Sequence, residues 1–206
     1  MKLSGDDYLG SMYALVVALF FPIGYGLYDF IKNKSMNFIS LLGFLSTLLT
    51  GGIGLFELDV EWLAIKEAAI PSAIGLVVLI SGFWGKPLIA KVLLNPIIFN
   101  LDLIYESLSN KDKTNEFKAK IQWANHLLAV TFVFSATMNY LLAKWIVVSP
   151  AGTTEFNEQL GEMTILSYPV IAIPSTIMLI AIMFYVVKSV MKLTDLKLEQ
   201  ILNAEK

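Results

Sequence analysis

The sequence predicts an all-α membrane protein, a polytopic bundle of about five transmembrane helices, and three observations lead to that fold class. The first is composition: 56% of the 206 residues are hydrophobic and 16% are charged, whereas a typical soluble domain has about 25% charged residues. The second is that the apolar residues gather in long runs. The third is that the charge of the links between these runs alternates along the chain. The mean hydropathy of +0.68 agrees with this fold class.

The apolar runs are long enough to cross a bilayer as helices. The run 36–56, MNFISLLGFLSTLLTGGIGLF, contains no charged residue, and a helix of about 20 apolar residues crosses the hydrocarbon core. Backbone polar groups have no water partner in lipid, so only helices or closed barrels can span it. Barrel strands would alternate polar and apolar residues. These runs are continuously apolar and therefore predict helices.

We predict five spans within a single membrane domain that covers residues 1–206. The first run counts as a retained span because the N-terminal MKLSGDDYLGSMY has no signal-peptide pattern of basic start, short apolar core and small-residue cleavage site. The spans are predicted at about 8–30, 36–56, 68–85, 121–148 and 163–187.

Lysine is unevenly distributed over the links between the spans. Twelve of the fifteen lysines fall in three segments: the short link between the first and second spans, the segment 86–120, and the tail 188–206. Short lysine-rich links stay in the cytoplasm, which predicts an external N-terminus and a cytoplasmic C-terminus. The opposite side receives few lysines and more acids, and its link before the third span reads ELDVEWLAIKEA, with Glu57, Asp59, Glu61 and Glu67 against Lys66.

The segment 86–120 is predicted to stay on the cytoplasmic side. Its apolar stretch contains Lys91, Pro96 and Asp102, and a charge near the bilayer centre costs about 2.5–3.5 kcal/mol. Within 97–108, the apolar residues follow helical spacing, which predicts an amphipathic helix on the cytoplasmic face of the membrane. The residues predicted to share its apolar face are Leu101, Ile104, Tyr105 and Leu108.

Polar residues inside spans are the first place to look for function. Asn139 lies deep in the fourth span, one helical turn after Ser135, and we predict that its amide bonds a neighbouring helix, with a ligand site as the alternative. His126, the one histidine, lies near the cytoplasmic end, either as an interfacial residue or as a proton relay. The candidate polar site comprises Asn139, Ser135, His126 and Ser175.

Two further patterns concern packing. Gly43, Thr47 and Gly51 recur every four residues in the second span, and small residues at that spacing allow close helix packing, within the chain or in a homodimer. Pro169 and Pro174 interrupt the fifth span. Broken helices of this kind line transporter sites, although prolines also occur in inert spans, where neighbouring groups restore the lost backbone bonds.

The sequence offers no pattern typical of an enzyme or of a nucleic-acid-binding protein. It has no cysteine and no arginine, so thiolate metal sites and the bidentate arginine fork are excluded. A P-loop, GxSxG and HExxH are absent. We therefore expect no catalytic residues, no cofactor, no bound metal and no nucleic-acid partner.

Three blocks resemble a family. FWGKPLI (83–89), FSATMNYLLAKWIV (134–147) and FNEQLGEMTILSYPVIAIPS (156–175) are similar to a group of uncharacterised bacterial inner-membrane proteins distantly related to intracellular septation protein A. The resemblance covers about the C-terminal two-thirds of the chain. It implies a bacterial inner membrane and a role in cell-envelope maintenance or septation, and it supplies no catalytic residues.

Two functional hypotheses remain. The first is a non-enzymatic multi-pass inner-membrane protein that acts through protein contacts, with itself as a homodimer or with other envelope proteins. The alternative is a small oligomeric membrane transporter with a polar site between the fourth and fifth spans, for which the glycine-containing face of the second span would supply the dimer contact.

Overall fold

The computed structural model describes residues 38–203, with side chains from residue 46 onward. The predicted first span, 8–30, lies outside the described residues apart from a few positions. Those positions are Tyr13, Val16, Val17, Phe20, Ile23, Gly24 and Tyr28.

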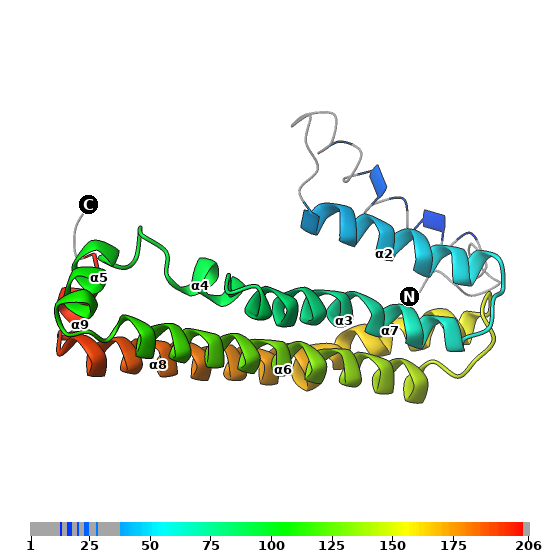
Figure 1. The fold of residues 1–206 in the computed structure, drawn as a ribbon. Coiled ribbons are helices and arrows are strands. Elements are labelled where there is room, and N and C mark those ends of the chain that lie inside the picture. The colour runs from blue at the N-terminus through cyan, green and yellow to red at the C-terminus, as the bar shows by residue number, and fades with distance from the viewer. Residues whose placement is uncertain are drawn as a thin grey trace. The chain divides into compact units, whose positions relative to one another are not determined.

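The described chain is a series of helices (Figure 1), which confirms the all-α prediction. Among the described residues, β pairing is limited to one isolated antiparallel bridge between Phe99 and Leu202. The helices are α2 (Phe38–Leu55), α3 (Glu61–Phe83), α4 (Leu88–Leu93), α5 (Leu101–Asn110), α6 (Thr114–Ile146), α7 (Thr154–Ser167), the π-helix η1 (Tyr168–Ala172), α8 (Ile173–Thr194) and α9 (Leu198–Ile201).

Three of the described helical stretches are long and apolar enough to cross a membrane. They are Glu61–Phe83, Thr114–Ile146 and Thr154–Thr194, and they contain most of the third, fourth and fifth predicted spans. In the last of them, only 17% of the most apolar window is buried inside the chain. Such an exposed apolar surface is typical of a helix that faces lipid.

Helix α3 begins before the start of the third predicted span. We placed its start at residue 68, whereas α3 begins at Glu61 and already includes Lys66 and Glu67. The prediction places these two charged residues in the external link, and an isolated charge in a span is costly. In the structure they form an ion pair, which lowers that cost and lets the helix start one to two turns earlier.

The proline-containing fifth span is continuous. Helices α7, η1 and α8 follow one another without a loop from Thr154 to Thr194. Pro174 has no backbone N–H, and its ring crowds the carbonyl one turn earlier, so the regular i→i−4 bonding is interrupted there. The π-helical turn at Tyr168–Ala172 widens the helix just before this proline.

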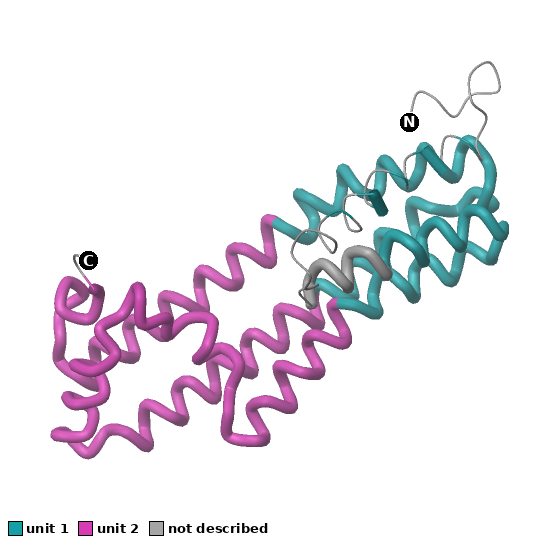
Figure 2. The backbone as a smooth tube through the Cα atoms, turned by 90° about the horizontal axis from the view of Figure 1, so that it is seen from above, with its two compact units in different colours: residues 1–70, 135–172 teal, residues 71–134, 173–206 magenta. Residues whose placement is uncertain are grey.

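The chain divides into two compact units, each made of two separate segments (Figure 2). Unit 1 comprises residues 1–70 and 135–172. Its described core joins the end of α2 and the start of α3 to the end of α6 and to α7. The buried apolar side chains of this core are Ile53, Leu63, Val147, Ala151, Phe156 and Leu160.

Unit 2 comprises residues 71–134 and 173–206. In it the end of α3 approaches α6 closely: a Cβ built on Gly75 would lie 2.9 Å from the Cβ of Phe132. A larger residue at position 75 would therefore push the two helices apart. The core of the unit extends from this contact through α4 and α5 to α8 and α9, and includes Val78, Ile89, Ile104, Leu108, Ala124, Val186 and Ile201.

The predicted amphipathic helix exists in part, and its apolar face has a protein partner. Residues 96–98 form a turn, and α5 begins at Leu101 with the Asn100 side chain accepting a hydrogen bond from the Leu103 amide at 3.2 Å. Ile104 and Leu108 are fully buried, and α5 contacts α8 and α9. Half of the face that we assigned to the membrane surface is thus part of the core of unit 2.

Residues 195–203 fold back onto α5 and the turn before it, and we call this segment the C-terminal clasp. The backbone N–H of Asn100 donates to the Ile201 carbonyl at 3.0 Å, and the backbone N–H of Asn203 donates to the Ile98 carbonyl at 2.8 Å. Lys111 forms an ion pair with Asp195, and its hydrogen bond lowers the pKa of the Asp195 carboxyl. The stabilisation of the folded chain by this ion pair is present at neutral pH, and it is lost as the pH falls through the lowered pKa of Asp195.

The clasp makes a first testable prediction. Ile201 is fully buried whereas Leu198, on the same short helix, is 44% exposed. Replacing Ile201 with Ala should leave a cavity and lower the free energy of unfolding by about 2–4 kcal/mol. Leu198→Ala should change it by less than about 0.5 kcal/mol. Denaturant unfolding in mixed micelles measures both, and equal effects of the two variants would mean that the clasp is not part of the core.

Candidate functional site

Asn139 bonds within its own helix. Its amide nitrogen donates to the Ser135 carbonyl at 2.8 Å and to the Ser135 hydroxyl at 3.3 Å. The structure thus gives Asn139 an intrahelical partner in place of the neighbouring helix that we predicted. The reason is local, because a residue one turn earlier already offers two oxygen acceptors within reach of the amide.

The other two residues of the predicted polar site belong to unit 2. His126 is half-buried and lies edge-on to two aromatic rings, with centroid distances of 6.2 Å to Phe83 and 6.5 Å to Trp123. The Ser175 hydroxyl is buried just after the π-helix and has no hydrogen-bond partner among the described residues. Of the four predicted residues, Asn139 and Ser135 bond to each other.

The predicted packing face of the second span lies on α2. Gly51 is buried and Thr47 is half-buried, while Gly43 belongs to the part of α2 for which only the backbone is described. Gly52 was not included in the prediction, and a Cβ built on it would have the Phe56 ring, 4.0 Å away, as its nearest contact. Gly51 therefore faces the interior of unit 1, as close packing within the chain requires, whereas the side of Gly52 is open.

One side chain that does join helices is Asn125, which is not among the residues of the predicted polar site. Asn125 is fully buried. Its amide nitrogen donates to the Val78 carbonyl on α3 at 2.7 Å, and its amide oxygen accepts from the Ile89 amide on α4 at 3.2 Å. One side chain of α6 thus binds two other helices of unit 2.

The contact with α4 replaces a missing cap. The first amides of a helix have no partner within the helix, and the residue before α4, Pro87, offers no side-chain acceptor. The Ser81 hydroxyl accepts from the Leu88 amide at 3.1 Å, and Asn125 accepts from the next amide, that of Ile89. Two side chains from α3 and α6 therefore cap a helix that cannot cap itself.

Glycines permit this arrangement. A Cβ on Gly82 would lie 2.9 Å from the amide nitrogens of both Asn125 and Gln122, so a larger residue there would displace the Asn125 amide from its two partners. Gly85 has a φ of +68°, which glycine adopts without strain. At Gly85 the chain ends α3 with bonds from Gly85 to Gly82 and from Lys86 to Ser81, and this turn brings α4 back toward Asn125.

A second polar contact, in unit 1, was also missed. Lys66 is 8% exposed. Its ammonium pairs with the Glu67 carboxylate and donates to the Thr50 hydroxyl of α2 at 2.6 Å. Thr50 in turn donates to the Ser46 carbonyl at 3.0 Å. An ionisable pair inside a candidate span is a functional candidate, and here it also joins α3 to α2.

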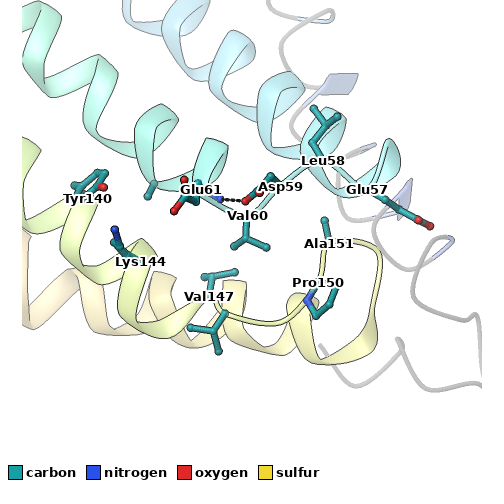
Figure 3. A pocket seen from close by; sticks show the side chains of 12 residues that line it. Glu57, Leu58, Asp59, Val60, Glu61, Tyr140, Lys144, Val147, Pro150 and Ala151 are labelled. Carbon is teal, nitrogen blue, oxygen red and sulfur yellow. Dashed lines mark hydrogen bonds between the residues drawn. The ribbon is translucent and has the colours of Figure 1, made fainter.

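The main charged cavity of unit 1 lies between the start of α3 and the end of α6 (Figure 3), with a volume of about 550 Å³. Figure 3 shows the Glu61 carboxylate and the Lys144 ammonium pointing into the same space. Asp59 accepts from the Glu61 amide at 2.9 Å, so it is held against the first turn of α3. The lining residues are Glu57, Leu58, Asp59, Val60, Glu61, Ala64, Tyr140, Lys144, Val147, Val148, Pro150 and Ala151.

Gln159 fixes one rim of this cavity. Its side-chain oxygen accepts from the amides of Val148 and Ser149, both at 2.9 Å, and its nitrogen donates to the Ser149 hydroxyl at 2.9 Å. These bonds hold the α6–α7 link against α7. Lys144 lies one turn earlier on α6, with its ammonium 5.7 Å from the centre of the Tyr140 ring, a distance typical of a cation–π contact.

No protein-family model, curated protein or solved structure matches this chain. The resemblance to septation proteins therefore stays a prediction. Within the described residues, no three His, Asp or Glu side chains gather closely enough to hold a metal ion.

The two asparagines of α6 allow a matched test. Asn125→Leu should leave the Ile89 amide without its acceptor and remove one of the two side-chain donors to the Val78 carbonyl, and it should lower the free energy of unfolding by about 1–3 kcal/mol. Asn139→Leu should lower it by about 0.6 kcal/mol or less, because its bonds stay within one helix. Thermal or denaturant unfolding in detergent measures both variants. A larger loss for Asn139→Leu would reverse our assignment of the interhelical contact.

Proposed function

We propose that this chain is a multi-pass inner-membrane protein with five spans, an external N-terminus and a cytoplasmic C-terminus, which acts through protein contacts and catalyses no reaction. The observation that carries the membrane assignment is the set of three long apolar helices with largely exposed flanks. A role in cell-envelope maintenance or septation, in a bacterial membrane, is what the family resemblance adds.

The four tryptophans support the membrane placement of two of these helices. Trp62 and Trp84 bracket α3, and Trp123 and Trp145 lie in α6; each is more than half exposed. Each pair marks out about 33 Å of helix at 1.5 Å per residue, close to the roughly 30 Å of the hydrocarbon core. Tryptophan is enriched where a helix leaves the hydrocarbon. The cavity of unit 1 then lies at the external boundary, next to Trp62 and Trp145.

The way in which polar groups are used supports a role in contacts. The Asn125 amide and the hydroxyls of Ser81, Ser189 and Thr194 bond to backbone groups of the chain. These bonds fix helices against one another or lie along one helix. Helices that are fixed to one another in this way and expose apolar side chains are suited to contact lipid and neighbouring proteins.

Transport is the second candidate, and the Lys66–Glu67 pair favours it. Charged pairs inside spans mark ion and substrate pathways in many carriers, and the π-helical turn before Pro174 is a feature that recurs at functional sites. In this proposal an oligomer would bind its substrate in a polar site between the fourth and fifth spans.

A complementation experiment separates the two functions. We expect deletion of the gene in its source bacterium to weaken the envelope or delay septation, and Asn139→Leu to restore growth as the unchanged chain does. A stable, well-expressed Asn139→Leu chain that restores nothing would favour the transporter.

The orientation makes a separate prediction. A cytoplasm-active reporter fused after residue 206 and a periplasm-active reporter inserted at Glu155 should both be active, because twelve of the fifteen lysines lie in the links that we assign to the cytoplasm. Exchanging the two reporters provides the control and should abolish both signals. Activity only after the exchange would show the opposite orientation.

A further inference from the structure

The Glu61–Lys144 cavity holds charges of opposite sign that do not neutralise each other. Lys144 makes no ion pair with a described carboxylate, and its ammonium instead faces the Tyr140 ring. Glu61 faces it from the first turn of α3 (Figure 3), and its carboxylate likewise has no ion pair with a described lysine. An acid and a base that point into one cavity without meeting leave room for a dipolar group between them.

The walls of the cavity continue from charged to apolar. Val60, Ala64 and Val147 line it beside the charged residues Glu57, Asp59, Glu61 and Lys144, and Ala64 and Val147 are buried in unit 1. A ligand that fits such a site has a charged, dipolar end and an apolar remainder. Soluble zwitterions satisfy the first condition, whereas lipids satisfy both.

The depth of the cavity in the membrane favours a lipid over a soluble ligand. Trp62 follows Glu61 and Trp145 follows Lys144 in the sequence, and the two tryptophans are 58% and 69% exposed. Exposed tryptophans at the ends of apolar helices lie at the depth of lipid headgroups. The cavity therefore opens where headgroups are the most concentrated dipolar molecules.

We propose that this cavity binds the headgroup of an aminophospholipid, with its primary ammonium at Glu61 and its phosphate at Lys144. The proposal rests on the membrane placement given under the proposed function. The ammonium would donate to the Glu61 carboxylate, and the Lys144 ammonium would donate to a phosphate oxygen, both as charge-assisted hydrogen bonds. The start of the acyl chains would contact the apolar wall at Val60 and Val147.

Native mass spectrometry of the detergent-purified full chain, with added phosphatidylethanolamine, phosphatidylcholine or phosphatidylglycerol, tests the site. We expect phosphatidylethanolamine to bind about tenfold more tightly than the other two. Phosphatidylcholine keeps the positive charge but has no N–H to donate, and phosphatidylglycerol has no cation. Free phosphoethanolamine should bind much more weakly than the lipid; equal binding would assign the site to a soluble metabolite and overturn the lipid proposal.

Variants locate the binding. Glu61→Gln and Lys144→Gln should each reduce the preference for phosphatidylethanolamine about tenfold, whereas Glu155→Gln and Lys188→Gln, which lie outside the cavity, should leave it unchanged. Equal affinity for the three lipids, or equal loss with the control variants, would refute the site. If Lys144→Gln instead lowers the melting temperature in lipid-free detergent and leaves lipid affinity unchanged, the two charges form a structural pair and the proposal is wrong.

Failure of the membrane orientation gives a different result. If the reporter fusions show the opposite orientation but the lipid preference and its loss in the two variants persist, the headgroup site stands on the cytoplasmic leaflet. If the orientation is as proposed and no lipid preference appears, the headgroup site alone is refuted.

Discussion

The hydrogen bonds of the Asn125 amide are the constraint on which the arrangement of unit 2 depends. A buried amide away from water is costly unless its polar atoms are bonded, and Asn125 satisfies both of them with the backbones of α3 and α4. The first amides of α4 equally need acceptors, because Pro87 provides none. The Asn125 side chain gives the Ile89 amide its acceptor, and the Ile89 amide satisfies the Asn125 oxygen. The three helices can meet only in the geometry that allows both of the Asn125 bonds.

Neighbouring features follow from that geometry. Gly82 leaves the space that the Asn125 amide occupies, and Gly85 supplies the left-handed turn that sends the chain back toward α6. Ser81 caps Leu88 and donates to the Val78 carbonyl at 2.6 Å, which is the same carbonyl that accepts from Asn125.

Much of the fold could be predicted from the sequence because it depends on composition along the chain. Helical structure and the three long apolar helices follow from hydropathy. The boundary at α3 could not be placed, since the sequence shows Lys66 and Glu67 as charges but does not show that they pair with each other and with Thr50. The burial of Ile104 and Leu108 was hidden for a similar reason: an amphipathic pattern shows that a face is apolar and leaves open whether lipid or protein covers it.

The polar site was harder to predict than the fold. Depth in the span favoured Asn139, yet depth does not decide which way an amide points, and Ser135 already satisfies it. Asn125 lies nearer the end of the span and gained its role from α4, a short helix that hydropathy does not detect. The Glu61–Lys144 cavity joins residues that are far apart in sequence, and no local motif marks it.

The C-terminal clasp also affects how the protein is made. Translation produces α5 well before α9, at about 5–20 residues per second, so for several seconds Ile104 and Leu108 have only part of their eventual cover. The pairing of Asn100 with Ile201, and of Ile98 with Asn203, is among the last steps that nascent unit 2 can complete. Until residue 203 has left the ribosome, the region around α5 presents apolar surface to chaperones and proteases. Unit 2 can complete its folding only after the C-terminal clasp has been synthesised.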